Sequence, residues 1–153
     1  MSLVDKPYIQ GRTFVFSIEK GEDLLPFLQQ FCIENQIKFA TISGIGAVYK
    51  ATFAIYDQKS KRYNKIQIEK ELEILSIIGN VSIYDYKPVI HAHITLSDQE
   101  GKAFGGHLMS PTILFSSEII IQELSTSQGS QIKTRKLDKM TQLLLWQSPL
   151  KTK

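Results

Sequence analysis

Apolar residues follow a helical spacing in one segment near the start of the chain. They recur at i, i+1, i+4, i+7 and i+8, and they are Leu24, Leu25, Leu28, Phe31 and Cys32. This spacing places all of them on one face of a helix. Pro26 is compatible with a helix only in its first turn, and Asn35 is a plausible end. We therefore predict one principal helix over about residues 23–35.

The rest of the chain has the pattern of strands. Short apolar or alternating stretches are separated by polar turns, which is typical of a sheet. They cover residues 13–18, 39–43, 49–56, 66–69, 72–78, 89–96, 102–108, 113–124, 133–137 and 143–146. Strands that gather after a single helix predict an α+β fold with a mainly antiparallel sheet, which the last two strands would close. We place a single domain at residues 12–146, between an N-terminal tail of residues 1–11 and a C-terminal tail of residues 147–153.

The composition limits the classes of protein to which the chain can belong. Its 153 residues suit one domain, and 42% hydrophobic against 22% charged residues indicate a folded chain. The single cysteine, Cys32, excludes an internal disulfide framework and a zinc site built mainly on thiolates. No apolar stretch approaches the roughly 20 residues that span a bilayer, and residues 1–10 lack the apolar core of a signal peptide. We expect a cytoplasmic protein with no membrane partner.

The three histidines, His91, His93 and His107, lie close together in the sequence. His91 and His93 are two positions apart in an expected strand, so both project from the face opposite its apolar residues. The polar turn at residues 98–101 would bring His107 back near the start of the first arm, beside His91. Three converging imidazoles suit Zn²⁺ with one open coordination position. The same spacing also fits two exposed histidines on a strand and a third in a turn.

A shared zinc ion would have consequences for geometry and for pH. The imidazole nitrogens must lie no more than about 5 Å apart pairwise, since each bond to zinc is about 2.0–2.1 Å long. Binding should weaken below about pH 6, because protonated imidazole cannot coordinate a metal. Glu73 and Glu118 are the carboxylates to consider first as a general base, although no motif pairs them with the histidines.

Two glycine pairs interrupt the strand pattern. Gly44 and Gly46 predict a bulge or a tight bend. Gly105 and Gly106 would let another backbone approach closely, either a neighbouring strand or a neighbouring subunit. Neither pair forms a dinucleotide-binding fingerprint.

Two basic clusters are the candidates for contact with nucleic acid. They contain Lys59, Lys61, Arg62, Lys133, Arg135 and Lys136. Either cluster could contact phosphates, and Tyr63 could stack on a base, but basic loops are also common as solvated surface. The formal net charge of +3 is too small to imply nucleic-acid binding by itself.

Five motifs occur in a familiar order along the chain. They are GEDLLPFLQQF, ISGIGAV, LEILSIIGN, HAHITLSDQEGKAFGGHL and an apolar strand that ends in QEL. In this order they resemble the PPC ("plants and prokaryotes conserved") domain family, over roughly residues 12–146.

The resemblance implies a homotrimer and a metal ion bound at His91, His93 and His107. Stand-alone prokaryotic members are commonly described as candidate DNA-binding proteins, whereas plant members carry an AT-hook that binds DNA. An AT-hook needs an Arg-Gly-Arg-Pro core, which this chain lacks. We therefore expect DNA binding, if it occurs, to be weak and independent of sequence.

Three functions are open at this point. The chain could be a homotrimeric DNA-associated regulatory protein, a zinc-dependent enzyme or small-molecule sensor, or a plain oligomeric scaffold. No catalytic group is identified by the residues, so a non-enzymatic role is favoured. Metal content and salt-dependent binding to duplex DNA would separate the three.

Overall fold

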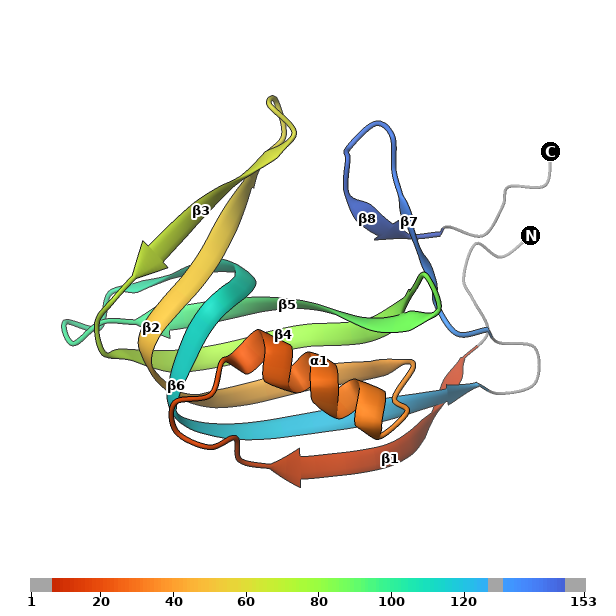
Figure 1. The fold of residues 1–153 in the computed structure, drawn as a ribbon, viewed down its shortest axis with the longest axis horizontal. Helices are drawn as coiled ribbons and strands as arrows, with labels where there is room; N and C mark the ends of the chain where they lie inside the picture. Colours follow the sequence, from red (N-terminus) through yellow and green to blue (C-terminus); the bar gives the residue numbers. More distant parts are fainter. Residues whose placement is uncertain (1–6, 127–130, 148–153) are drawn as a thin grey trace.

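The computed structural model describes residues 7–126 and 131–147. These residues form one helix and eight strands (Figure 1). In chain order they are β1 (Tyr8–Phe16), α1 (Leu24–Glu34), β2 (Ala40–Asp57), β3 (Arg62–Ile68), β4 (Leu72–Tyr84), β5 (Lys87–Ser97), β6 (Ala103–Thr126), β7 (Arg135–Leu137) and β8 (Leu144–Trp146). The predicted α+β fold with one principal helix is confirmed, and Asp23 and Asn35 cap that helix.

Six of the strands form one antiparallel sheet. Their order is β1-β6-β5-β4-β2-β3, and β6 also pairs with β2. The first residues of β6 pair with β5, and most of its length pairs with β2. Since β4 pairs with both β2 and β5, the strands β2, β4, β5 and β6 make a closed circuit of pairings. Figure 1 shows the strong curvature of β2 and β6 at this closed end.

Two pairs of expected strands are each one continuous strand in the structure. Residues 39–43 and 49–56 belong to β2, and residues 102–108 and 113–124 belong to β6. The Gly44–Gly46 segment does not end β2, but the register of β2 against β4 shifts there, as expected for a bulge. A Cβ atom on Gly46 would lie 2.2 Å from the backbone oxygen of Ser116, so glycine lets β6 pass close by. The glycines therefore bend the strand without breaking it.

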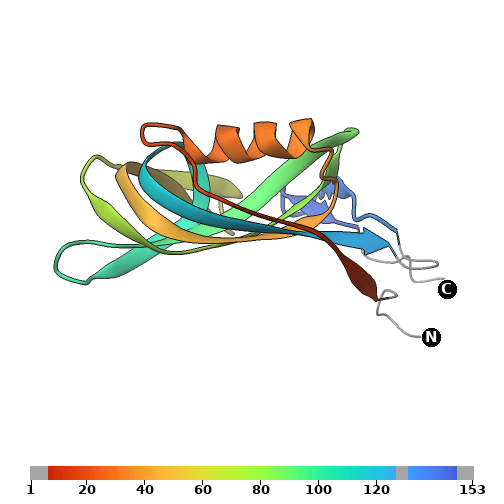
Figure 2. The same cartoon turned by 90° about the horizontal axis from the view of Figure 1, so that it is seen from below.

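The helix covers one face of the sheet (Figure 2). Leu24, Leu28 and Cys32 are fully buried against it. Burial raises the pKa of the Cys32 thiol to about 12, so this residue is a core side chain and not a nucleophile. The covered face of the sheet presents a row of residues that are direct cross-strand neighbours: Phe14, Ile121, Ile42, Gly79 and Ala92.

No helix of the described residues lies over the opposite face of the sheet. One row of cross-strand neighbours runs along this face: Val15, Ile120, Ser43, Ile78, His93 and His107. Val15 is 74% exposed and Ile78 is 69% exposed. His93 and His107 therefore share an open sheet face with exposed apolar side chains, and His91, two positions from His93 on β5, projects from the same face.

The last two strands do not close the main sheet, contrary to the expectation from sequence. β7 and β8 pair with each other. Their hairpin is held beside β4 by a hydrogen bond from the Ile83 N–H to the Lys133 carbonyl oxygen, 3.1 Å long. These strands have three residues each, and a single parallel bridge between Ile83 and Thr134 connects their segment to β4.

The described residues cover only part of the two tails expected from the sequence. β1 begins at Tyr8, inside the segment expected to be an N-terminal tail. Residues 1–6 and 148–153, which make up most of the two expected tails, lie outside the described residues. Within the described ranges, no helix has the length and apolar character needed to cross a membrane.

Candidate metal centre

The β5–β6 hairpin positions the three histidines. Its turn is fixed by Asp98, whose Oδ1 accepts hydrogen bonds from the backbone N–H groups of Glu100 and Lys102, at 3.1 and 3.0 Å. Gly101 in the same turn has a φ of +78°, a conformation that favours glycine. The polar turn expected at residues 98–101 thus joins β5 to β6.

The pairing of the hairpin places His107 directly opposite His93. The sequence had suggested that His107 would lie beside His91, at the start of the first arm. The difference follows from the tight turn, which pairs Ser97 with Ala103 and so fixes every later pair. The ring of His107 nevertheless reaches His91, with 5.0 Å between the two ring centroids.

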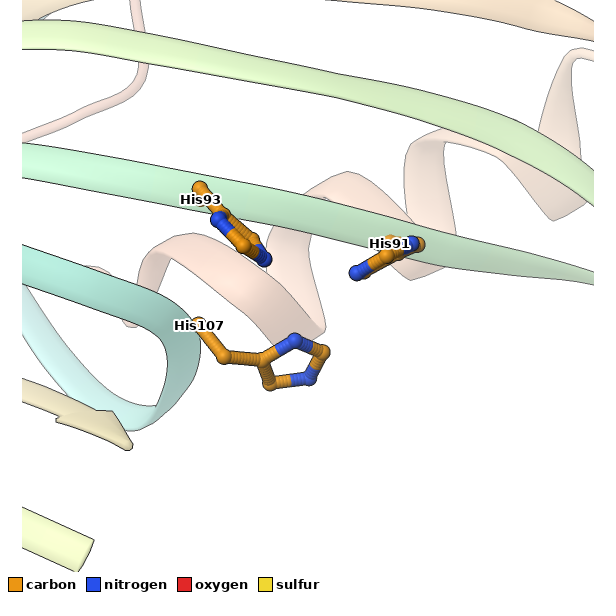
Figure 3. Close-up of side chains that lie close together, drawn as sticks. All are labelled: His91, His93 and His107. Atoms are coloured by element: carbon orange, nitrogen blue, oxygen red, sulfur yellow. The ribbon is translucent and has the colours of Figure 1, made fainter. Parts of the chain in front are cut away.

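The three imidazole rings gather around a common space (Figure 3). The ring centroids of His91 and His93 are 5.3 Å apart, and those of His93 and His107 are 5.7 Å apart. One nitrogen from each ring lies within 4.8 Å of the other two. This value is inside the limit of about 5 Å that a shared zinc ion requires. Tetrahedral bonds of 2.0–2.1 Å place ligand atoms about 3.4 Å apart, and side-chain torsions can close the difference.

The donor set fits a metal ion. The Nδ1 atom of His107 is buried and has no hydrogen-bond partner in the part of the chain that the structure describes. An unpaired buried nitrogen costs about 1–3 kcal/mol, which a metal ligand bond would offset. Burial, followed by the positive charges of His107, Arg135 and His93, lowers the pKa of His91 to about 4. Burial, followed by His93 and Arg135, also lowers the pKa of His107. Both imidazoles are therefore held in the neutral form that binds metals.

Two hairpins flank the histidines. The ring of Tyr63, on β3, lies 4.9 Å from that of His107, and the same tyrosine packs edge-on against Tyr56 of β2. On the other side Arg135, on β7, bonds to Asn80 of β4. Tyr63 was considered from sequence only as a base-stacking residue, whereas the structure places it beside the histidine cluster.

The second glycine pair allows strands of the same chain to approach closely. A Cβ atom on Gly105 would lie 2.0 Å from the carbonyl oxygen of Ile94, and one on Gly106 would lie 2.7 Å from that of Ala54. Of the two possibilities left open by the sequence, a neighbouring strand is therefore the one observed. Gly105 allows the close spacing of β5 and β6 on which the separation of His93 and His107 depends, and Gly106 allows the close approach of β2.

The basic residues lie on two hairpins. Lys59, Lys61 and Arg62 are exposed at the β2–β3 connection, and Lys136 is exposed on β7. Arg135, which the sequence groups with the phosphate-contacting candidates, is only 9% exposed. Its guanidinium is directed inward because Ser82 and Asn80 accept its hydrogen bonds, at 2.8 and 2.7 Å. No local pattern could have revealed these contacts, since they join positions 53 and 55 residues apart.

The two carboxylates considered as general bases lie elsewhere. Glu73 and Glu118 both line an open groove with Ile45 and Phe115. Glu73 pairs with Ser97, four positions along β5 from His93, which corresponds to about 13 Å at roughly 3.3 Å per residue. Neither carboxylate is placed to act at the histidine cluster.

The fold and the site together define a small α+β protein with a three-histidine cluster on the uncovered face of its sheet. The chain belongs to the Plants and Prokaryotes Conserved domain family (PCC, written PPC below). The sequence model of that family matches residues 6–125.

Solved structures share this fold over nearly the whole chain. A PPC protein from Pyrococcus horikoshii is 35% identical, with a TM-score of 0.87, and the match covers 96% of this chain and 99% of that one. A metal-containing protein from Archaeoglobus fulgidus is 38% identical, with a TM-score of 0.85 and coverage of 94% and 98%. A protein from Ralstonia eutropha JMP134, described as a candidate DNA-binding protein, is 27% identical, with a TM-score of 0.77 and coverage of 93% and 96%.

A curated relative is much longer than this chain. The bifunctional protein GlmU of a Synechococcus strain is 23% identical over 111 residues. The match covers 72% of this chain but only 17% of that protein. The chain thus spans about a sixth of the length of the curated relative that it matches.

Proposed function

We propose that this PPC-domain protein binds one Zn²⁺ per chain through His91, His93 and His107 and presents its open coordination position to a small ligand. The observation that carries the proposal is the convergence of three imidazole nitrogens within 4.8 Å, one of them buried without a partner. The metal-containing protein of Archaeoglobus fulgidus, 38% identical to this chain, supports it.

The donor set favours zinc and an open site. Neutral imidazoles are good ligands for Zn²⁺, and three protein ligands leave a fourth position for water or another molecule. Zinc bound in this way supplies Lewis acidity and lowers the pKa of a bound water. We favour ligand binding over hydrolysis because Glu73 and Glu118 lie in the separate groove, away from the cluster.

Zinc titration of purified, metal-stripped protein tests the proposal. We expect one zinc per chain. Replacing any one histidine by alanine should weaken binding by more than about 100-fold, since even outer-shell partners contribute 10–100-fold. Thr95→Ala is the matched control, because Thr95 is an exposed residue two positions from His93 on the same strand. Zinc affinity that is unchanged in His93→Ala would show that the cluster is not the site.

A second proposed activity is weak association with DNA. It is supported by the description of the Ralstonia eutropha relative and by the exposed cations Lys59, Lys61 and Arg62. Phosphate contacts need only charge, so binding should be independent of sequence and should weaken steeply with salt.

The DNA proposal is tested by titrating duplexes of unrelated sequence at two salt concentrations. Replacing Lys59, Lys61 and Arg62 together by alanine should reduce the salt slope by about 3, or roughly one for each lost phosphate contact. Tight binding to one sequence at physiological salt would contradict this proposal.

We also propose that the protein assembles as a homotrimer. The exposed apolar residues Val15, Ile78 and Ile120 lie in one row on the uncovered sheet face. Exposed apolar surface of this kind is typical of a protein–protein contact.

A further inference from the structure

Arg135 is a buried cation that has no carboxylate partner among residues 7–126 and 131–147. Its guanidinium donates to the Ser82 hydroxyl, the Asn80 side-chain carbonyl and the Leu144 backbone carbonyl, at 2.8, 2.7 and 2.8 Å. All three acceptors are neutral. The ion pairs found in the described ranges do not include Arg135. The ring of Trp146 lies 5.6 Å from the guanidinium carbon and covers one of its faces.

These contacts compensate the buried charge only in part. Arginine is rarely buried unless it is paired, because removing a charge from water is costly. A guanidinium has five N–H groups, and the bonds to Ser82, Asn80 and Leu144 use three of them. Burial lowers the pKa of Arg135, and no negative charge opposes that effect. The positive charge therefore remains available to an anion.

The charge lies beside the histidine cluster. Asn80 is the direct cross-strand neighbour of His91, and such neighbours project from the same face about 5 Å apart. The guanidinium that bonds to Asn80 is therefore close to His91 on the uncovered face. The charge of Arg135 contributes to the lowered pKa of both His91 and His107, which agrees with this placement.

The sum of local charges points to an anionic ligand. Three neutral imidazoles with a divalent metal ion carry a charge of +2, and Arg135 raises it to +3. The cluster itself contains only histidines among the described residues. Bound cations dominate the electrostatics of such a site, and a second cation in a partly buried setting strengthens the attraction of an anion.

We propose that Arg135 makes the open side of the histidine cluster a binding site for a small oxyanion, a carboxylate or a phosphate. The proposal rests on the zinc site proposed above and names the class of ligand that this site takes. Arg135 acts by its charge, while its bonds to Asn80 and Ser82 hold that charge in place. Tyr63, against the ring of His107, borders the same site from the β3 side.

The test measures anion affinity of the zinc-loaded protein by calorimetry at constant ionic strength. The probes are inorganic phosphate in one titration and acetate in the other. The anion that binds more tightly is the preferred oxyanion. Zinc content is determined first for every variant. Arg135→Gln should weaken binding of the preferred anion by at least about 10-fold, whereas Arg135→Lys, which keeps the charge, should change it by less than about 3-fold. Zinc stoichiometry should remain one per chain in both.

Two further variants control for folding and for net charge. Asn80→Asp places a carboxylate where an oxygen already accepts a bond from Arg135, so it should neutralise the guanidinium and weaken anion binding without removing that residue. Lys136→Gln removes the same unit of charge from the neighbouring, exposed position and should leave the affinity unchanged.

The outcomes separate this inference from the proposed function. Zinc-loaded Arg135→Gln that binds the anion as tightly as the unmodified protein would overturn the inference and leave the zinc site standing. Weakening by Lys136→Gln equal to that by Arg135→Gln would also overturn it, because net charge alone would then explain the effect. An unmodified protein that binds no zinc would overturn the proposed function together with this inference.

Discussion

Two of the three clustered imidazoles resist protonation because of where they lie. His91 is partly buried and faces the positive charges of its neighbours, which lowers its pKa to about 4. Its ordinary value is about 6.5. At His91, protons would therefore compete with a bound metal only at a pH below the limit of about 6 that was expected from the sequence. Burial in this fold, and not the ordinary pKa of histidine, would determine how far the proposed site keeps its metal as the pH falls.

The metal-free protein should lose stability as the pH falls. Between about pH 6.5 and 4 the unfolded chain protonates His91 while the folded chain does not, so acid favours unfolding in this window. Above pH 6.5 this contribution to the free energy of unfolding is absent. We expect the Tm measured in chelator to fall from pH 7 to 4.5, and His91→Gln to reduce the size of that fall.

The comparison with His91→Gln isolates one residue from the general effect of acid. Hydrogen bonds, chiefly from backbone N–H groups, lower the pKa of Asp57 and Asp98, so these carboxylates also lose stabilising contacts at low pH in both proteins. A His91→Gln protein whose Tm falls as steeply as that of the unmodified protein would contradict the assignment.

Residue alternation was the most informative signal in the sequence. Ile90, Ala92 and Ile94 are buried and His91 and His93 project from the other face, as a period of two requires. The short turn after β5 then made His107 a candidate neighbour. Arg135 could not be placed in this way, because its role depends on how β7 packs beside β4 and not on its own neighbours in the chain.

At the scale of elements, the spacing between β5 and β6 determines the site. Gly105→Ala would place a Cβ atom 2.0 Å from the carbonyl oxygen of Ile94, so the two strands would have to separate. We expect a loss of about 1–3 kcal/mol in the free energy of unfolding, as is typical of overpacking. Zinc affinity should fall as well, because His93 and His107 pair across the same two strands.

Denaturant unfolding and zinc titration check this prediction. Ala103→Ser is the matched control, since Ala103 is exposed two positions earlier on the same strand. Both measurements should be nearly unchanged in the control. Gly105→Ala with unmodified stability would show that the strands tolerate a wider spacing.

The lengths of the elements were harder to predict than their type. The helix and the antiparallel pairing followed from spacing, whereas β2 and β6 were each divided into two at residues that interrupt the pattern. Gly44 and Gly46 interrupt the pattern of β2, yet the backbone continues because β4 and β6 pair with it on both sides. Long-range pairing of this kind overrides a local break signal.

At the scale of the molecule, the two faces of the sheet have different neighbours. The helix covers one face, and the row from Val15 to His107 lies on the other. The proposed trimer would bury part of that row. Val15→Asp should therefore convert the assembly to single chains of 17.4 kDa, because a carboxylate is costly in an apolar contact.

Light scattering at micromolar concentration measures this change. Ile33→Asp is the control, since Ile33 is also exposed but lies on the helix, at the other side of the sheet. The control should keep the mass of the unmodified protein. An unmodified protein that is already a single chain under these conditions would contradict the trimer.

The two faces of β5 have different roles, because one packs in the core and the other carries two of the clustered histidines. Its even-numbered residues Ile90, Ala92, Ile94 and Leu96 are buried in the core, and its odd-numbered residues His91 and His93 face the site. A substitution at Ile90, Ala92 or Ile94 should be detected in an unfolding experiment, and one at His91 or His93 in a binding experiment. Between residues 90 and 94, alternate positions of one strand thus serve the core and the histidine cluster, so the cluster can be altered by substitution without changing the core side chains.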